Sequence, residues 1–105
     1  MSAMARGFIL IPDEIAERTD LTLAHKMVLG SLGRIQGRSA SCYPSIEYVA
    51  NSVGMSESTA RRAINDLVRK KEIKRLFHHR QTSTYSVAWA TARNLRRKWA
   101  QKETA

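Results

Sequence analysis

The feature that most constrains the fold is the spacing of two helical segments, which only three residues separate. The first segment, residues 46–53, carries apolar side chains at helical spacing and stops at Gly54. The second, residues 57–71, follows Ser56, whose hydroxyl can cap its first turn. A glycine, one apolar residue and a capping serine predict a tight turn between two packed helices, which is the sequence form of a helix-turn-helix.

Two further helices are predicted before this pair. Residues 13–18 suit a short first helix because acidic side chains stand at its positive N-terminal end. A second helix is expected from Thr22, a suitable N-cap, to Gly37, a suitable stop. Gly30 and Gly33 cost this helix up to about 1 kcal/mol each relative to alanine. We therefore expect a neighbouring element to pack closely against them.

Strand-forming residues follow the central pair of helices. Residues 73–77 and 82–87 predict a β-hairpin, with the four residues between them at its tip. Residues 89–102 then return to a helical pattern with many basic side chains. We expect a mainly α domain with a small β-hairpin wing, a winged helix-turn-helix, over residues 8–88, followed by a basic C-terminal helix or tail over 89–105.

Charge is divided unevenly along the chain. The 105 residues hold 18 Lys and Arg against 9 Asp and Glu, a formal net charge of +9. Residues 1–54 carry five basic and five acidic side chains, so the whole excess lies from Met55 onward. Such asymmetry favours a nucleic acid or another anionic partner over an evenly charged soluble domain.

The chain lacks the residues that several classes of function require. Cys42 is the only cysteine, which excludes an internal disulfide and a cysteine-based zinc site, and we expect it to be buried. The chain has no apolar run long enough for a membrane span, and residues 1–7 lack the apolar core of a secretion signal, so a cytoplasmic protein is expected. Without a phosphate-binding loop, nucleophile signature or paired-carboxylate motif, we expect neither an enzyme nor a cofactor or small-molecule ligand.

One long motif spans the two central helices. It comprises Cys42-Tyr43-Pro44-Ser45-Ile46-Glu47-Tyr48-Val49-Ala50 and Val53-Gly54-Met55-Ser56-Glu57-Ser58-Thr59-Ala60-Arg61-Arg62-Ala63-Ile64-Asn65-Asp66-Leu67, preceded by Phe8-Ile9-Leu10-Ile11-Pro12 and Leu21-Thr22-Leu23-Ala24-His25-Lys26. Through this motif and the order of its predicted helices and strands, the chain resembles the winged helix-turn-helix family of phage and plasmid replication proteins and related small regulators of mobile elements. The resemblance covers residues 8–88, with Val49 where the pattern usually has leucine. It implies binding of double-stranded DNA in a bacterial or phage setting, either for replication initiation or for transcriptional control.

The second helix of the central pair presents a polar, basic face. When Ala60, Ile64 and Leu67 face the core at 100° per residue, the opposite face holds the side chains that we expect to read bases. These are Ser58, Arg61, Arg62 and Asn65. In the major groove, Arg can form two hydrogen bonds with guanine, and Asn can bond adenine. The alternative is a merely solvated face, which the preceding short turn and the following basic hairpin make the weaker reading.

A second set of residues suits the DNA backbone. Hydroxyl and N–H groups at a helix N-terminus bind phosphate oxygens, and basic residues of a wing meet phosphate or enter a minor groove. The candidates are Ser45, Ser56, Thr59, Arg69, Lys74, Arg75, His79 and Arg80. Ser45 and Ser56 also have a sufficient role as helix caps. Since His78 and His79 would point to opposite faces of a strand, no metal site is expected there.

The C-terminal helix carries an apolar stripe among basic residues. The stripe consists of Trp89, Ala92, Leu95 and Trp99. Packing against the first helix of the same chain would bury it in a monomer. We favour two-fold pairing through this helix, which would present two recognition helices to half-sites about one turn, or a small multiple of a turn, apart.

The leading hypothesis is sequence-specific binding of double-stranded DNA, and three alternatives stand beside it. A protein-interaction winged helix would bind an acidic partner, but it should expose apolar anchors where this chain has Ser, Arg and Asn. The basic tail suggests RNA or an anionic membrane surface as another partner. The aromatic residues could stack on bases of single strands or RNA, yet they are scattered, so core and sheet packing is expected of them; they are Tyr43, Tyr48, Tyr85, Phe8 and Phe77.

Overall fold

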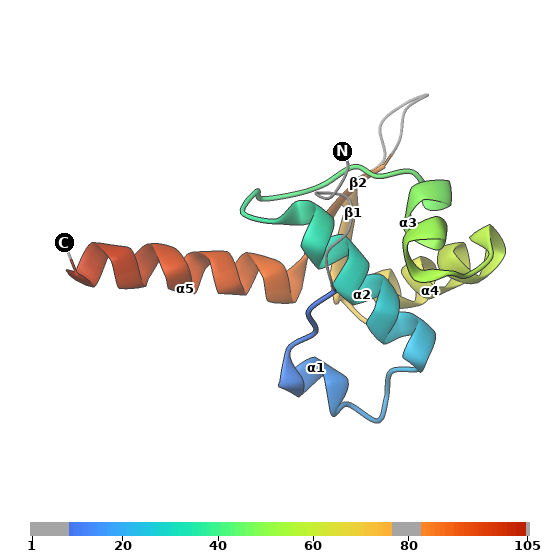
Figure 1. Ribbon diagram of the computed structural model, residues 1–105, viewed down its shortest axis with the longest axis horizontal. Coiled ribbons are helices and arrows are strands. Elements are labelled where there is room, and N and C mark those ends of the chain that lie inside the picture. Colours follow the sequence, from blue (N-terminus) through green and yellow to red (C-terminus); the bar gives the residue numbers. More distant parts are fainter. Residues whose placement is uncertain (1–8, 77–82, 105) are drawn as a thin grey trace.

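The helix of residues 23–36 lies at the centre of the structure, in contact with the two central helices, the sheet and the C-terminal helix (Figure 1). The computed structural model describes residues 9–76 and 83–104, with side chains up to Arg96. In chain order the elements are α1 (Asp13–Ala16), α2 (Leu23–Gln36), α3 (Ile46–Val53), α4 (Glu57–Arg69), β1 (Ile73–Leu76), β2 (Thr84–Val87) and α5 (Ala88–Thr104). This order confirms the predicted fold class, a mainly helical chain with a β-hairpin and a C-terminal helix.

The turn between α3 and α4 has the predicted geometry. Gly54 ends α3 in the left-handed conformation, with φ 68° and ψ 38°, which a residue without a Cβ atom adopts at little cost. The backbone N–H of Met55 then donates to the carbonyl of Ala50 at 3.0 Å. Ser56 begins α4 by accepting the backbone N–H of Thr59 on its hydroxyl at 3.2 Å. Gly54, Met55 and Ser56 thus set α3 and α4 against each other.

The two strands form an antiparallel sheet that extends the helical core. Ile73 pairs with Val87 at one end and Leu76 with Thr84 at the other. Ser83, which was predicted in the second strand, precedes β2, and residues 77 and 82 of the predicted strands lie outside the described residues, as does the predicted tip, residues 78–81. Cys42 adds an isolated bridge to Tyr85, with backbone hydrogen bonds of 2.8 and 2.7 Å. The Cys42 side chain is buried, as predicted, and burial raises the pKa of its thiol to about 11.

Both glycines of α2 lie beneath neighbouring side chains. A Cβ atom on Gly33 would stand 2.2 Å from Cζ2 of Trp89, and one on Gly30 would stand 2.3 Å from Cγ2 of Ile9. The predicted close packing is therefore confirmed at both positions. The N-terminal segment packs on one glycine and α5 on the other. The low helix propensity of glycine is offset here by the close approach that it permits.

Gln36, near the end of α2, is the fully buried polar residue that joins three parts of the fold. Its Oε1 accepts the backbone N–H of Val87 at 2.9 Å. Its Nε2 donates to the carbonyl of Ser39 at 3.1 Å and to Oγ1 of Thr91 at 3.2 Å. Every polar atom of the amide thus has a partner, which removes the cost of burying it. The junction of β2 with α5 is held against the end of α2.

Candidate nucleic-acid interface

The exposed face of α4 carries all four predicted base-reading residues. They are Ser58, Arg61, Arg62 and Asn65, and each is exposed. On the opposite face, Ala60, Ile64 and Leu67 are completely buried, so the core fixes the rotation of the helix about its axis. A hollow of about 540 Å³ follows the exposed face, and Arg69 from α4 and Arg75 from β1 complete its basic lining.

Two residues that line this hollow, one from α4 and one from β1, form a hydrogen bond. Nη1 of Arg75 donates to Oδ1 of Asn65 at 2.7 Å. Lys74, the preceding residue in β1, is exposed, while Arg75 is half-buried, because successive residues of a strand point to opposite faces. The wing strand therefore supports α4 through Arg75. Its other basic residue, Lys74, faces solvent.

Asp66 is an acidic residue within this basic face, and its role was not predicted from the sequence. Its Oδ2 lies 3.1 Å from Nε2 of His25, and its Oδ1 pairs with Arg69. The His25 Nδ1 accepts the backbone N–H of Thr22 at 3.0 Å, so Nε2 is the nitrogen that carries the proton and donates to Asp66. Hydrogen bonding to His25, with a further contribution from Arg69, holds the pKa of Asp66 below its usual range. A spacing of three residues between Asp66 and Arg69 on a helix was the available sequence signal.

The serines assigned to phosphate binding both act as helix caps. Ser45 accepts the backbone N–H of Tyr48 at 3.0 Å and begins α3. The Ser56 hydroxyl also donates to Oγ1 of Thr59 at 2.9 Å, and both of these side chains are exposed at the N-terminus of α4. Capping was predicted for both serines. Their contact with phosphate stays a prediction, as do the roles of Arg69 and Lys74.

Two predicted wing residues, His79 and Arg80, lie outside the described residues. Among the residues that the structure describes, no three His, Cys, Asp or Glu side chains lie close enough together to hold a metal ion. No helix in the described ranges has the length and apolar character needed to cross a membrane.

The predicted apolar stripe of the C-terminal helix is divided between two environments. Trp89 packs over Gly33 of α2, and its indole N–H donates to the carbonyl of Leu29 at 3.4 Å. Ala92 is half-buried, whereas Leu95 is 47% exposed. The Trp89 side chain is thus half-buried within its own chain, against α2 rather than α1. The Trp99 side chain lies outside the described part of the chain, and the prediction of pairing through α5 stays a prediction.

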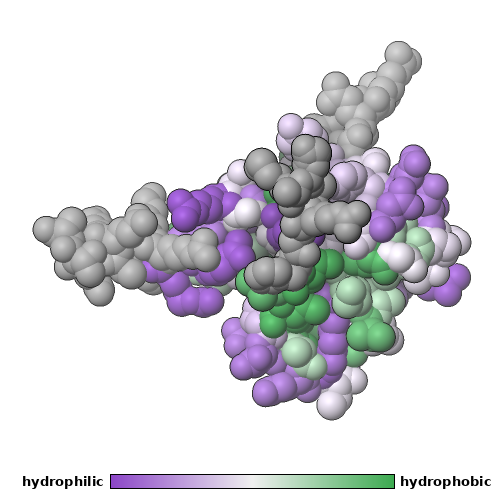
Figure 2. Space-filling view, in the orientation of Figure 1, coloured by the Kyte–Doolittle hydropathy of each residue, from purple (hydrophilic) through white to green (hydrophobic). Residues whose placement is uncertain are grey.

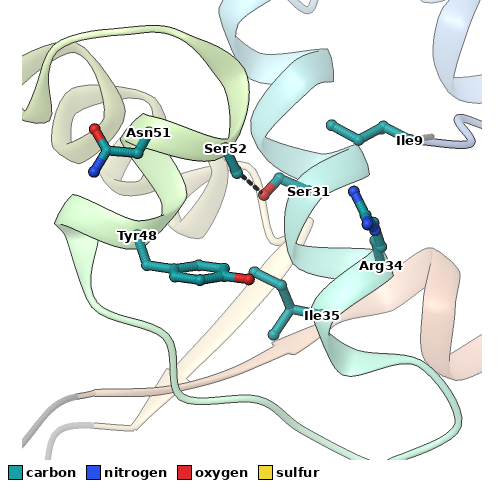
Figure 3. Close-up of a pocket in the computed structure, with 7 residues that line it drawn as sticks. All are labelled: Ile9, Ser31, Arg34, Ile35, Tyr48, Asn51 and Ser52. Carbon is teal, nitrogen blue, oxygen red and sulfur yellow. Dashed lines mark hydrogen bonds between the residues drawn. The ribbon is translucent and has the colours of Figure 1, made fainter. Parts of the chain in front are cut away.

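A second hollow, of about 550 Å³, lies between α2 and α3 (Figure 3). Tyr48 extends from α3 across it toward Ile35 of α2, and the hydroxyls of Ser31 and Ser52 meet beside it at 2.7 Å. Tyr48 is 61% exposed and Tyr43 is 76% exposed. The expectation of core packing is therefore wrong for these two tyrosines, because neither position faces the core. It is confirmed for Tyr85, which is buried in the sheet.

The surface in this view separates into apolar and hydrophilic regions (Figure 2). Apolar side chains gather over the middle of the face, around α2, and hydrophilic ones cover much of α1, the first part of α5 and the outer edge of α3 and α4. Leu10 and Leu23 are among the exposed apolar residues. Since single exposed leucines are normal on a soluble domain, they add no site of their own.

Comparisons with known proteins agree with this geometry. The family described as a helix-turn-helix domain matches residues 19–71, just over half of the chain, which covers α2, α3 and α4. Among solved structures, the crystal structure of MepR, a transcription regulator of the Staphylococcus aureus multidrug efflux pump MepA, is similar with a TM-score of 0.57. It shares 18% sequence identity with this chain, over 88% of this chain and 68% of that one. No curated protein sequence matches at a significant level.

Proposed function

Because the chain belongs to the helix-turn-helix domain family, we propose that it binds double-stranded DNA with α4 in the major groove. The observation that carries the proposal is the exposed face of α4, where two arginines, a serine and an asparagine line a basic hollow. Arg61 and Arg62 suit guanine, and Asn65 and Ser58 reach other base edges. The four exposed residues of this face are polar or charged, whereas a protein-binding surface needs exposed aromatic or aliphatic anchors.

The DNA backbone is bound by residues around this face. Ser45, Ser56 and Thr59 stand at the starts of α3 and α4, where helix N-termini attract phosphate. Arg69 and Lys74 add charge beside this face. We expect His79 and Arg80 to meet phosphate or enter a minor groove. The net charge of +9, all of it from the second half of the chain, supports this assignment.

The biological role that we propose is sequence-specific regulation of transcription or initiation of replication on a mobile element. Similarity in fold to a transcription regulator supports the first of these, and the resemblance to phage and plasmid replication proteins supports both. In either role the protein acts through binding and not as an enzyme. Selection of bound sites from random duplexes identifies the target and so separates a promoter operator from a replication origin.

We propose further that two copies pair through α5. The helix extends away from the rest of the domain (Figure 1), and Leu95 is exposed on it beyond the part that packs on α2. A symmetric dimer would place two copies of α4 on successive half-sites.

The central test measures duplex binding by fluorescence anisotropy as salt is raised. Five or six phosphate contacts at about 0.9 log units each predict a steep loss of affinity between low and physiological salt. Arg62→Ala should cost about 1–3 kcal/mol on the selected site and relax preference at one base position. Arg38→Ala, which removes an exposed arginine from the segment after α2, serves as the matched control and should leave that preference unchanged. A flat salt dependence would contradict DNA binding.

A further inference from the structure

Asn65 stands on the exposed face of α4 with its amide oxygen already engaged by the protein. Arg75 reaches from β1 and donates Nη1–H to Oδ1 of Asn65 at 2.7 Å. Asn65 is exposed, Arg75 is half-buried, and both line the hollow that contains Arg61 and Arg62. The hydrogen bond therefore lies at the surface where a base edge would be read.

This hydrogen bond decides which end of the amide is presented. An asparagine amide has an acceptor oxygen and a donor nitrogen on opposite branches of one planar group. With Oδ1 on Arg75, Nδ2 is turned away from the strand. Rotating the amide by 180° would bring its N–H groups against the guanidinium N–H groups, which have no acceptor to offer. Arg75 thus selects one of two orientations that would otherwise be available to an exposed asparagine.

We propose that Arg75 is a positioning residue that makes Asn65 a hydrogen-bond donor toward DNA and thereby sets base preference at one position. The inference rests on the proposed function. A donor suits the major-groove acceptors of three bases, which are N7 and O6 of guanine, N7 of adenine and O4 of thymine. It opposes cytosine, which presents an amino group, itself a donor, at the same edge. One position of the preferred site is accordingly depleted of cytosine on the strand that α4 contacts.

The binding experiment selects sites from random duplexes with the wild-type chain and four variants. Asn65→Ala and Arg75→Met should both lose the discrimination against cytosine at the same position, by about fivefold to tenfold. Lys74→Met is the matched control, because it removes one charge from the neighbouring residue of β1 that faces away from Asn65; it should weaken all duplexes evenly and keep the preference. Asn65→Asp should shift that position toward cytosine or adenine, since the carboxylate keeps Arg75 on one oxygen and presents an acceptor with the other.

Two results would overturn the proposal while leaving DNA binding intact. One is an Arg75→Met variant that keeps the preference lost in Asn65→Ala. The other is an Asn65→Ala variant that changes no single position. The selection with the wild-type chain tests the proposed function separately. If the wild-type chain binds no duplex, both the proposed DNA binding and the positioning role of Arg75 are contradicted.

A measurement on the free protein completes the test. Restricted rotation of the Arg75 guanidinium, detected by NMR of its Nη groups, should be present in the wild-type chain and lost in Asn65→Ala. Free rotation in the wild-type chain would contradict the orienting hydrogen bond without reference to DNA.

Discussion

The indole ring of Trp89 occupies the space into which the Cβ atom of any other residue at position 33 would project. A Cβ atom there would stand 2.2 Å from Cζ2 and 2.9 Å from Cε2 of the ring. The ring has little freedom to move aside, because its N–H donates to the carbonyl of Leu29 in α2 and the guanidinium of Arg93 lies over it. Position 33 therefore requires glycine because of packing, since its backbone is ordinary α-helix.

Gly33→Ala should destabilise the protein by about 1–3 kcal/mol, because the overpacking outweighs the gain of up to about 1 kcal/mol in helix propensity. Gly30→Ala is the matched control in the same helix. Its new Cβ atom would meet the side chains of Ile9 and Ile11, which can rotate, so the loss should be smaller. Urea unfolding of both variants measures the difference. Equal stability of the two would contradict the packing argument.

Gln36→Leu should destabilise the fold by about 1–3 kcal/mol, because the backbone N–H of Val87 loses its acceptor in a buried place. Thr91→Val removes one of the two acceptors of the Gln36 amino group and leaves the carbonyl of Ser39. Its cost should be clearly lower. Chemical unfolding at neutral pH ranks the two variants, and the reverse order would show that the amide contributes little.

Stability should fall in acid as two carboxylates become protonated. Hydrogen bonding to Arg18 lowers the pKa of Asp20 to about 2, and hydrogen bonding to His25 lowers that of Asp66. A carboxyl group whose pKa is lower in the folded chain stabilises it fully above the unfolded pKa, about 4, and loses this effect as pH falls through the folded value. The wild-type chain should thus exceed Asp20→Asn in stability at pH 7, and the gap should close toward pH 2. A gap independent of pH would rule out this linkage.

Pairing through α5 predicts that Leu95→Glu lowers the sedimentation coefficient of the intact chain at micromolar concentration. The fold should be unaffected because Leu95 is 47% exposed. Arg96→Glu places the same side chain on the next, also exposed, position and should have the smaller effect, since it lies outside the apolar stripe. A wild-type chain that sediments as a monomer without DNA would refute dimerisation by this helix.

Local chemistry made much of this fold predictable from the sequence. Gly54 and Ser56 act within a few residues of their own positions, so a stop signal and a cap locate the turn before any tertiary contact is known. The exposed face of α4 followed from helical periodicity in the same way, because its polar and apolar residues are cleanly separated.

Contacts between residues far apart in the sequence were harder to predict. His25 meets Asp66 across 41 positions, and no local pattern relates the two residues. Arg75 and Asn65 were each assigned to DNA, while the hydrogen bond between them depends on how β1 leaves α4. Tyr48 was assigned to packing because the aromatic residues are scattered along the chain. Its exposure follows from the side of α3 on which it stands.

The junction of α5 with α2 also determines how force passes through the molecule. Arg93 and Asn94 both donate to the carbonyl of Gly37, and the guanidinium of Arg93 lies over the Trp89 ring at 4.9 Å from its centroid. A 17-residue helix is about 25 Å long, so α5 is a lever with its fulcrum at the end of α2. A sideways load on its far end would therefore act as a torque on α2. Because α2 packs directly on α4, that torque would reach the helix that carries Arg61 and Arg62.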